Sequence, residues 1–282
     1  MRRRAALRRL AAGLCAGFYA LAARADDAAP LALDGVPAQG ALLHGRAPPG
    51  AVVWLRGKRL HVDPDGTFVI GFGRDEAGPV ELAVDRPGAA RRVVRLEVAR
   101  HAWPVQRIDG LPPAQVTPDA AALARIRAEQ TRLDAARGVD SAEQGFRQRW
   151  IWPATGPISG VYGSQRILNG EPRAPHVGLD IAAPEGAPVR APAAGVVRLA
   201  EPDLFFTGGT VIVDHGHGVM TLYAHQSALA VRVGQRLAQG DPIGRVGKTG
   251  RVTGPHLHFA LYWLGVALDP QPLLPPPPTA AN

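Results

Sequence analysis

The chain of 282 residues contains a single cysteine, Cys15, and only two lysines. Because Cys15 lies in a segment that we expect to be removed, the rest of the chain can form no disulfide and offers no thiol nucleophile or cysteine ligand. Aromatic residues make up only 6% of the sequence, but hydrophobic residues make up 46%, which suffices for a core. The composition therefore excludes a disulfide scaffold and cysteine chemistry, and it favours a globular protein.

The first 25 residues have the pattern of an export signal. Five arginines between Arg2 and Arg9 precede an apolar run over 10–23, and a small-x-small cleavage site ends at Ala25. The apolar run is shorter than the roughly 20 residues that span a bilayer, and no other long apolar segment follows. We expect a signal peptide over 1–25, no stable membrane span in the mature chain, and a periplasmic or otherwise exported location in the cell envelope. An uncleaved anchor is the alternative, whereas Leu14 before Cys15 argues against a lipoprotein.

The basic character of the chain comes mostly from this segment. Six of the 32 basic residues and none of the 24 acidic residues lie in 1–25, so the remaining chain holds 26 basic and 24 acidic residues and a net charge of +2. A nucleic-acid partner needs a basic patch or stripe. The arginines between Arg86 and Arg100 alternate with apolar residues, which indicates the solvated face of a strand. We expect no nucleic-acid partner.

Residues 30–100 read as a small β domain. Short alternating runs such as 51–55 and 67–70 are separated by Gly- and Pro-containing turn signals. The pattern predicts an N-terminal β-sandwich similar to immunoglobulin-like accessory domains, with His44 and His61 at the surface or in turns.

Residues 101–149 are predicted to be a helical linker. Thr117 and Pro118 suit the N-cap and the first helical position, and Gly138 supplies a stop. Leu123 and Leu133 belong to one narrow apolar stripe, which suits a helix that packs on one neighbour or spaces two domains.

From 150 to 272, short apolar runs alternate with glycine and proline, and this predicts an antiparallel β-sandwich or barrel-like domain, followed by a Pro-rich tail over 273–282. Six of the nine histidines lie within 83 residues of this region, which points to a metal or a catalytic site: His176, His215, His217, His225, His256 and His258. The glycines that alternate with His215 and His217 place those two in a hairpin turn.

His256-Leu257-His258 lies in an apolar run that is typical of a strand. Side chains at positions i and i+2 of a strand project from the same face, about 6.6 Å apart along the backbone. Both imidazoles would therefore face one groove, while Leu257 and Phe259 face the core. For such a pair taken alone, two exposed strand histidines without a role are the alternative.

His176 precedes Asp180 by four residues, but Pro175 and Gly178 disfavour a helix, so a loop that leads into a strand must bring the two side chains together. His176, Asp180 and one histidine of the pair described above would give three ligands and leave a fourth position for water, as in catalytic zinc sites. Nitrogen and oxygen donors also suit other divalent metals.

Three motifs, in this order, closely resemble those of the LytM or lysostaphin-type zinc metallopeptidases over residues 150–272: His176-x-x-x-Asp180, Tyr223-Ala224-His225 and Gly254-Pro255-His256-Leu257-His258-Phe259. The resemblance implies a mainly β catalytic domain with the duplicated hybrid motif fold. It implies that His176, Asp180 and His258 bind Zn²⁺, and that His225 and His256 are a catalytic pair that does not bind the metal. Residues 30–100 lie outside the resemblance.

The resemblance also implies a secreted zinc metalloendopeptidase that hydrolyses peptide bonds in peptidoglycan stem peptides or cross-links by metal-activated water. Peptidoglycan is then the substrate, and residues 30–100 could bind an envelope protein partner. The alternative is a non-catalytic cell-wall-binding protein or an amidase activator on the same fold. Relatives of that kind usually lack some metal ligands, whereas this sequence keeps all of them.

Overall fold

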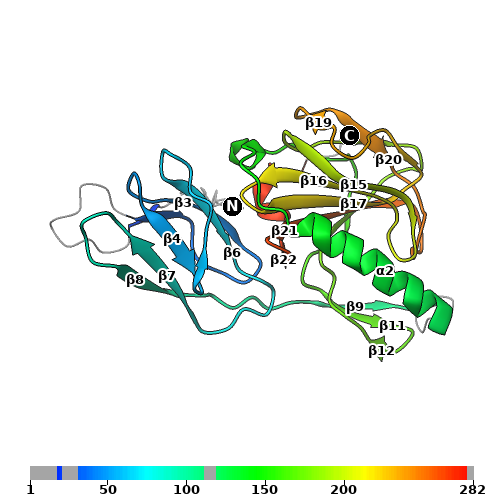
Figure 1. Ribbon diagram of the computed structural model, residues 1–282. Coiled ribbons are helices and arrows are strands. Elements are labelled where there is room, and N and C mark those ends of the chain that lie inside the picture. Colours follow the sequence, from blue (N-terminus) through cyan, green and yellow to red (C-terminus); the bar gives the residue numbers. More distant parts are fainter. Residues whose placement is uncertain (1–17, 21–30, 111–118, 278–282) are drawn as a thin grey trace, which may run out of the picture.

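The computed structural model describes residues 18–20, 31–110 and 119–277. Strands dominate it, and it contains one α-helix, α2 (Ala120–Arg137), within the described ranges. The predicted mainly β fold class is therefore confirmed. Figure 1 shows an N-terminal part, built from β1 to β8, beside a C-terminal part, built from β10 to β22, against which α2 lies. No helix in the described ranges has the length and apolarity that a membrane span requires.

Two antiparallel sheets of four strands form the N-terminal part, with the orders β1-β2-β3-β6 and β5-β4-β7-β8. The strands are β1 (Phe18–Ala20), β2 (Ala32–Asp34), β3 (Leu42–Arg46), β4 (Val52–Leu55), β5 (Lys58–Arg59), β6 (Thr67–Gly71), β7 (Pro79–Asp85) and β8 (Arg92–Glu97). In β7 every second side chain is buried, as expected of a sheet with one face on the core. The immunoglobulin-like relationship and the domain boundaries remain predictions.

One antiparallel sheet of eight strands dominates the C-terminal part; its order is β10-β13-β21-β17-β16-β15-β19, and β22 pairs with β21. These strands are β10 (Ile158–Gly160), β13 (Leu179–Ala182), β15 (Gly195–Leu204), β16 (Gly208–Gly216), β17 (Val219–Gln226), β19 (Arg236–Leu237), β21 (His256–Trp263) and β22 (Val266–Leu268). Every residue of β16 and β17 is buried, so the centre of this sheet is covered on both faces.

Two small sheets flank the large one. Their orders are β12-β11-β9 and β14-β20-β18. The strands are β9 (Val105–Ile108), β11 (Gln165–Leu168), β12 (Glu171–Pro172), β14 (Pro188–Arg190), β18 (Ala228–Leu229) and β20 (Pro242–Arg245). Strand β9 pairs in parallel with β11, so the predicted helical linker contains a strand that joins the C-terminal part.

Helix α2 begins two residues later than the sequence predicts. Its N-cap is Asp119, whose carboxylate accepts a hydrogen bond of 2.8 Å from the backbone N–H of Ala122. Aspartate is a strong N-cap because it satisfies a backbone donor that has no partner within the helix. Thr117 and Pro118, the predicted cap and first helical residue, lie outside the described residues, whereas Gly138 is the C-cap as predicted.

The helix packs on the C-terminal part through the second half of its apolar stripe. Leu133 is buried, but Leu123 is 41% exposed. The buried carboxylate of Glu129 accepts hydrogen bonds from the backbone N–H of Phe205 at 2.8 Å and from Arg125 Nε at 2.6 Å. Because Phe205 follows β15, this contact fixes the helix to the connection between β15 and β16.

Asp63 of the N-terminal part is the centre of the contact with the C-terminal part. Its carboxylate accepts from Arg147 Nη2 at 2.5 Å and lies 3.1 Å from His217 Nε2. The ring of His61 stacks on that of His217 at a centroid distance of 4.2 Å, and His44 Nε2 lies 3.1 Å from the carbonyl oxygen of Phe146, which lies between α2 and β10. His44 lies in β3 rather than in a turn, and both histidines are at partly exposed positions where their rings also make these contacts.

The predicted hairpin turn contains His217, but His215 belongs to β16, and both side chains are buried. His215 Nδ1 lies 2.7 Å from the carbonyl oxygen of Ala194, and its Nε2 lies 2.7 Å from Thr221 Oγ1. Burial lowers the pKa of His215 to about 4, although the hydrogen bond with Ala194 and the charge of Asp214 oppose the shift. His215 is therefore a neutral core residue at pH 7.

We expect His215 to make stability depend on pH. The unfolded chain binds a proton at this residue near the reference pKa of about 6.5, and the folded chain does so only near 4, so stability falls as the pH decreases through this interval. Between about pH 7 and about pH 5, the free energy of unfolding measured with urea should fall by about 2 kcal/mol more in the wild type than in His215→Gln. The exposed His101→Gln variant is the control and should lose as much as the wild type. Equal losses in wild type and His215→Gln would disprove the assignment.

Candidate metal and catalytic site

Three neighbouring strands bring the predicted site residues together. In the pairing of β13 with β21, Asp180 lies opposite His258, and His256 is two residues away on the same strand. Strand β17 pairs with the other edge of β21 and carries His225 near its end. His176 reaches the group from the loop that precedes β13. All five residues are thus adjacent, although the first and the last are 82 positions apart in the chain.

Three donor atoms of this group converge on one point. His176 Nε2 lies 3.0 Å from Asp180 Oδ1 and 3.0 Å from His258 Nδ1, and the last two atoms are 2.8 Å apart. All three residues are buried. Two imidazole nitrogens and one carboxylate oxygen are a ligand set that Zn²⁺ accepts, with room for a fourth ligand.

The hydrogen-bond partners around this point suit a cation. His176 Nδ1 lies 3.0 Å from the carbonyl oxygen of Val161, so Nδ1 carries the proton of the neutral ring and Nε2 presents a lone pair. That lone pair faces the carboxylate oxygen of Asp180 and the ring nitrogen of His258. A metal ligand histidine commonly donates its other N–H to such an acceptor. The residues present therefore fit a divalent metal.

The electrostatics of the cluster keep its ligands in the forms that bind metals. Burial by itself would raise the pKa of Asp180, but hydrogen bonds and charge interactions with His176 and His258 outweigh it and hold the pKa well below its usual range. Burial lowers the pKa of His258, against the opposing effect of Asp180. An ionised carboxylate and a neutral imidazole are the states in which these groups coordinate a metal.

Two glycines leave the space that the ligands occupy. A Cβ on Gly178 would lie 2.8 Å from Cε1 of His258, and a Cβ on Gly160 would lie 2.5 Å from Oδ2 of Asp180. Both distances are shorter than real contacts of this kind. The sequence alone shows that Gly178 disfavours a helix. The fold alone shows that a side chain at this position would clash with His258, which is 80 positions further along the chain.

His225 and His256 form a second pair beside the three donors. Their ring centroids are 4.8 Å apart. His225 Nδ1 lies 2.9 Å from the carbonyl oxygen of Thr249, and His256 Nδ1 lies 2.9 Å from that of Gly254, so each Nδ1 donates and each Nε2 presents a lone pair. His256 Nε2 is 3.8 Å from Asp180 Oδ1, beyond hydrogen-bond distance.

His225 has a strained backbone and a perturbed ring. Its φ of 64° is in the left-handed region, and the backbone hydrogen bond to Thr207 (2.7 Å) holds it there. Such strain persists where surrounding contacts enforce it, often at functional sites. Burial, together with His258 and His256, lowers the pKa of His225 to about 3. The imidazole is therefore neutral at pH 7 and can accept a proton.

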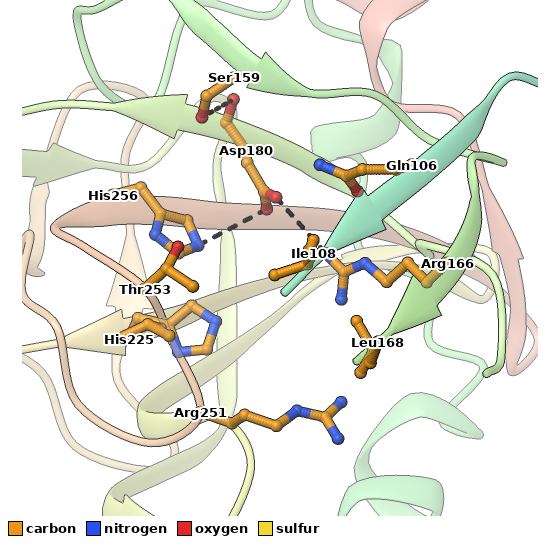
Figure 2. A pocket seen from close by; sticks show the side chains of 11 residues that line it. Gln106, Ile108, Ser159, Arg166, Leu168, Asp180, His225, Arg251, Thr253 and His256 are labelled. Carbon is orange, nitrogen blue, oxygen red and sulfur yellow. Dashed lines mark hydrogen bonds and ion pairs between the residues drawn. The ribbon is translucent and has the colours of Figure 1, made fainter. Parts of the chain in front are cut away.

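A pocket opens beside this pair. Figure 2 shows His225 and His256 on one side of it and Gln106, Arg166 and Leu168 on the other. Arg166 Nη2 lies 3.5 Å from Asp180 Oδ2. Sequence reasoning missed Arg166, which has no distinctive spacing, and Gln106, which belongs to β9 in the predicted linker.

A second cluster of two histidines and one aspartate occurs where the two parts of the molecule meet: His61, Asp63 and His217. Its rings are stacked, with centroids 4.2 Å apart and planes inclined by only 20°. A metal lies in the plane of each imidazole that binds it, and two nearly parallel planes share no nearby point. The rings of His176 and His258 are inclined by 47°, so their planes can intersect at a metal. We assign the metal site to the cluster with His176.

Comparison with known proteins identifies the part of the chain that carries this site. Residues 174–270 match the model of Peptidase family M23. Residues 174–270 form an M23 peptidase domain. A crystal structure assigned to peptidase M23 from Pseudomonas aeruginosa superposes with a TM-score of 0.65 at 29% identity, covering 85% of this chain and 95% of that one. The similarity to that structure therefore extends well beyond the M23 domain.

Three curated relatives match part of this chain. Peptidoglycan DD-endopeptidase ShyA of Vibrio cholerae is 40% identical over 43% of this chain, and DD-carboxypeptidase/endopeptidase Mpg of Neisseria meningitidis is 44% identical over 36%. Murein hydrolase activator EnvC of Escherichia coli is 41% identical over 45%. The matches cover 28%, 24% and 29% of the relatives' own lengths, so the chain spans less than a third of each.

The geometry predicts one metal ion per chain. Zinc analysis of the purified protein after dialysis should give about one equivalent, because of the two clusters in the described residues only the one with His176 has imidazole planes that can meet at a metal. His258→Ala should lose this zinc, since two ligands remain. His61→Ala, the matched change in the stacked cluster, should retain it. Two equivalents in the wild type, or loss of zinc from His61→Ala, would contradict the assignment.

Proposed function

We propose that the chain is a zinc metalloendopeptidase that hydrolyses peptide bonds in peptidoglycan stem peptides or cross-links. The observation that carries the proposal is the convergence of His176 Nε2, Asp180 Oδ1 and His258 Nδ1 beside two neutral imidazoles. The names of the relatives ShyA and Mpg support the substrate class, since both are endopeptidases and the first is a peptidoglycan enzyme.

Each residue of the site has a role in this proposal. His176, Asp180 and His258 hold the zinc ion, which when bound would polarise the substrate carbonyl and lower the pKa of water. His225 and His256 both offer Nε2 lone pairs towards the pocket. One accepts the proton of the attacking water; the pair then stabilises the negative charge on the former carbonyl oxygen and delivers a proton to the leaving amine. The depressed pKa of His225 makes its protonated form a strong acid towards that amine.

Export to the cell envelope is part of the proposal, because peptidoglycan lies there. The predicted signal segment 1–25 lies outside the described residues except for β1, so its cleavage remains a prediction. An envelope partner for residues 30–100 is likewise a proposal. The exposed apolar side chains Val36 and Val93, which are 52% and 51% accessible, are candidate contacts in that part.

A second candidate function is activation of another wall hydrolase without catalysis. It is favoured by the match to EnvC, whose name describes a murein hydrolase activator. The complete set of donors and the neutral pair of His225 and His256 favour catalysis instead, because an activator has no use for a strained, buried imidazole beside a metal site.

Digestion of purified sacculi tests the two candidates. The zinc-loaded protein should release muropeptides, and His256→Ala should reduce the rate about 100-fold or more while it retains zinc, because proton transfer is lost and the ligands remain. The exposed His101→Ala variant is the control and should keep full activity. An inert wild type with zinc bound would refute the peptidase; if that inert protein accelerates a purified amidase, the activator is correct.

A further inference from the structure

Three arginines gather beside the catalytic pocket. Arg166 comes from β11, Arg173 from the loop after β12, and Arg251 from the loop before β21. Arg166 and Arg251 line the pocket directly. Asp180 is the one carboxylate among the described residues that line the pocket, and its Oδ1 is already one of the three candidate metal-ligand atoms. The pocket wall is therefore rich in positive charge.

The arginines are partly removed from water and act on one another. Burial lowers the pKa of Arg251, and the charges of Arg166 and Arg173 lower it further. The Nε atoms of Arg166 and Arg173 are buried and have no hydrogen-bond partner in the part of the chain that the structure describes. Like charges at low exposure are costly unless an anion compensates them. The cluster is thus arranged for a negative group that enters the pocket.

The position of Arg251 is fixed by packing. Its guanidinium lies over the ring of Phe206, 4.3 Å from the centroid, and its backbone N–H donates to the carbonyl oxygen of Phe206 at 2.9 Å. A stacked guanidinium loses little further freedom when it binds an anion, and it can offer two parallel N–H groups to a carboxylate.

The arginines are close to the reacting centre. Arg166 Nη2 lies 3.5 Å from Oδ2 of Asp180, the ligand candidate whose other oxygen faces the metal position. Figure 2 shows Arg166 across the pocket from His256 and His225, and Arg251 below His225. One residue of an extended peptide spans about 3.3–3.6 Å, so a group held by Arg166 lies within about two residues of the bond at the metal.

We propose that Arg166, Arg173 and Arg251 form a subsite for a substrate carboxylate, and that the protein prefers peptides with a free carboxylate within about two residues of the scissile bond. This inference rests on the proposed function, because it places the carboxylate relative to a bond that is cut. It adds a substrate requirement that the metal and its histidine neighbours do not impose.

Binding to the metal-free protein tests the subsite without turnover. The probes are fluorescently labelled muropeptides from sacculi, used with their carboxylates free or converted to neutral amides with methylamine and carbodiimide. Fluorescence anisotropy should show about tenfold or tighter binding of the free form, as expected for a charge-assisted pair. Arg251→Gln should reduce the preference to about threefold or less, and Arg251→Lys should retain part of it. The exposed Arg232→Gln, outside the pocket, should leave it unchanged.

Turnover by the zinc-loaded protein separates the two proposals. Amidation should raise KM with little change in kcat, because the carboxylate is bound equally in the ground and transition states. Equal affinity for both probes would overturn the subsite. It would also be overturned if Arg251→Gln keeps the wild-type melting temperature and still prefers the free-carboxylate probe as strongly as the wild type does. Failure to cleave either probe, with the binding preference intact, would overturn the proposed peptidase and leave the carboxylate subsite standing.

Discussion

The site depends on the close approach of three potential metal-binding atoms at one buried point. His176 Nε2, Asp180 Oδ1 and His258 Nδ1 approach within 3.0 Å of one another, and the first two are both acceptors. The fold enforces this approach through strand register, since Asp180 and His258 lie opposite each other in the pairing of β13 with β21. A sheet is rigid enough to hold Asp180 and His258 in place, and binding of a divalent metal would in turn stabilise the pairing that created the site.

Much of the site could be predicted from the sequence because its signals are local. The two-residue period of a strand places His256 and His258 on one face, and the structure has both in β21. The choice of His258 over His256 as the ligand came from resemblance alone. In the structure His258 Nδ1 lies 2.8 Å from Asp180 Oδ1, whereas His256 Nε2 is 3.8 Å away. The roles of the five residues remain proposals.

Other features depend on contacts between distant segments, and no local pattern reveals them. His215 is a core residue because its two ring nitrogens find partners on neighbouring segments, although its glycine neighbours suggest a turn. His61 is partly covered because its ring stacks on that of His217, more than 150 residues further along the chain. Strand β9 forms one wall of the pocket only because it pairs with β11, about 60 residues further along the chain. In each case, tertiary contacts override a local sequence pattern that is typical of a surface or a linker.

The pocket wall that β9 and β11 supply lies outside residues 174–270, so the M23 domain alone does not make the whole site. The most direct test of the account concerns the metal position itself. X-ray absorption at the zinc edge of the zinc-loaded protein should give a first shell of nitrogen and oxygen atoms at about 2.0–2.2 Å with the outer-shell scattering of two imidazoles. The His225→Ala/His256→Ala double variant should give the same spectrum. Three or more imidazoles in the wild type, or a spectrum that changes in the double variant, would contradict the ligand set on which the account depends.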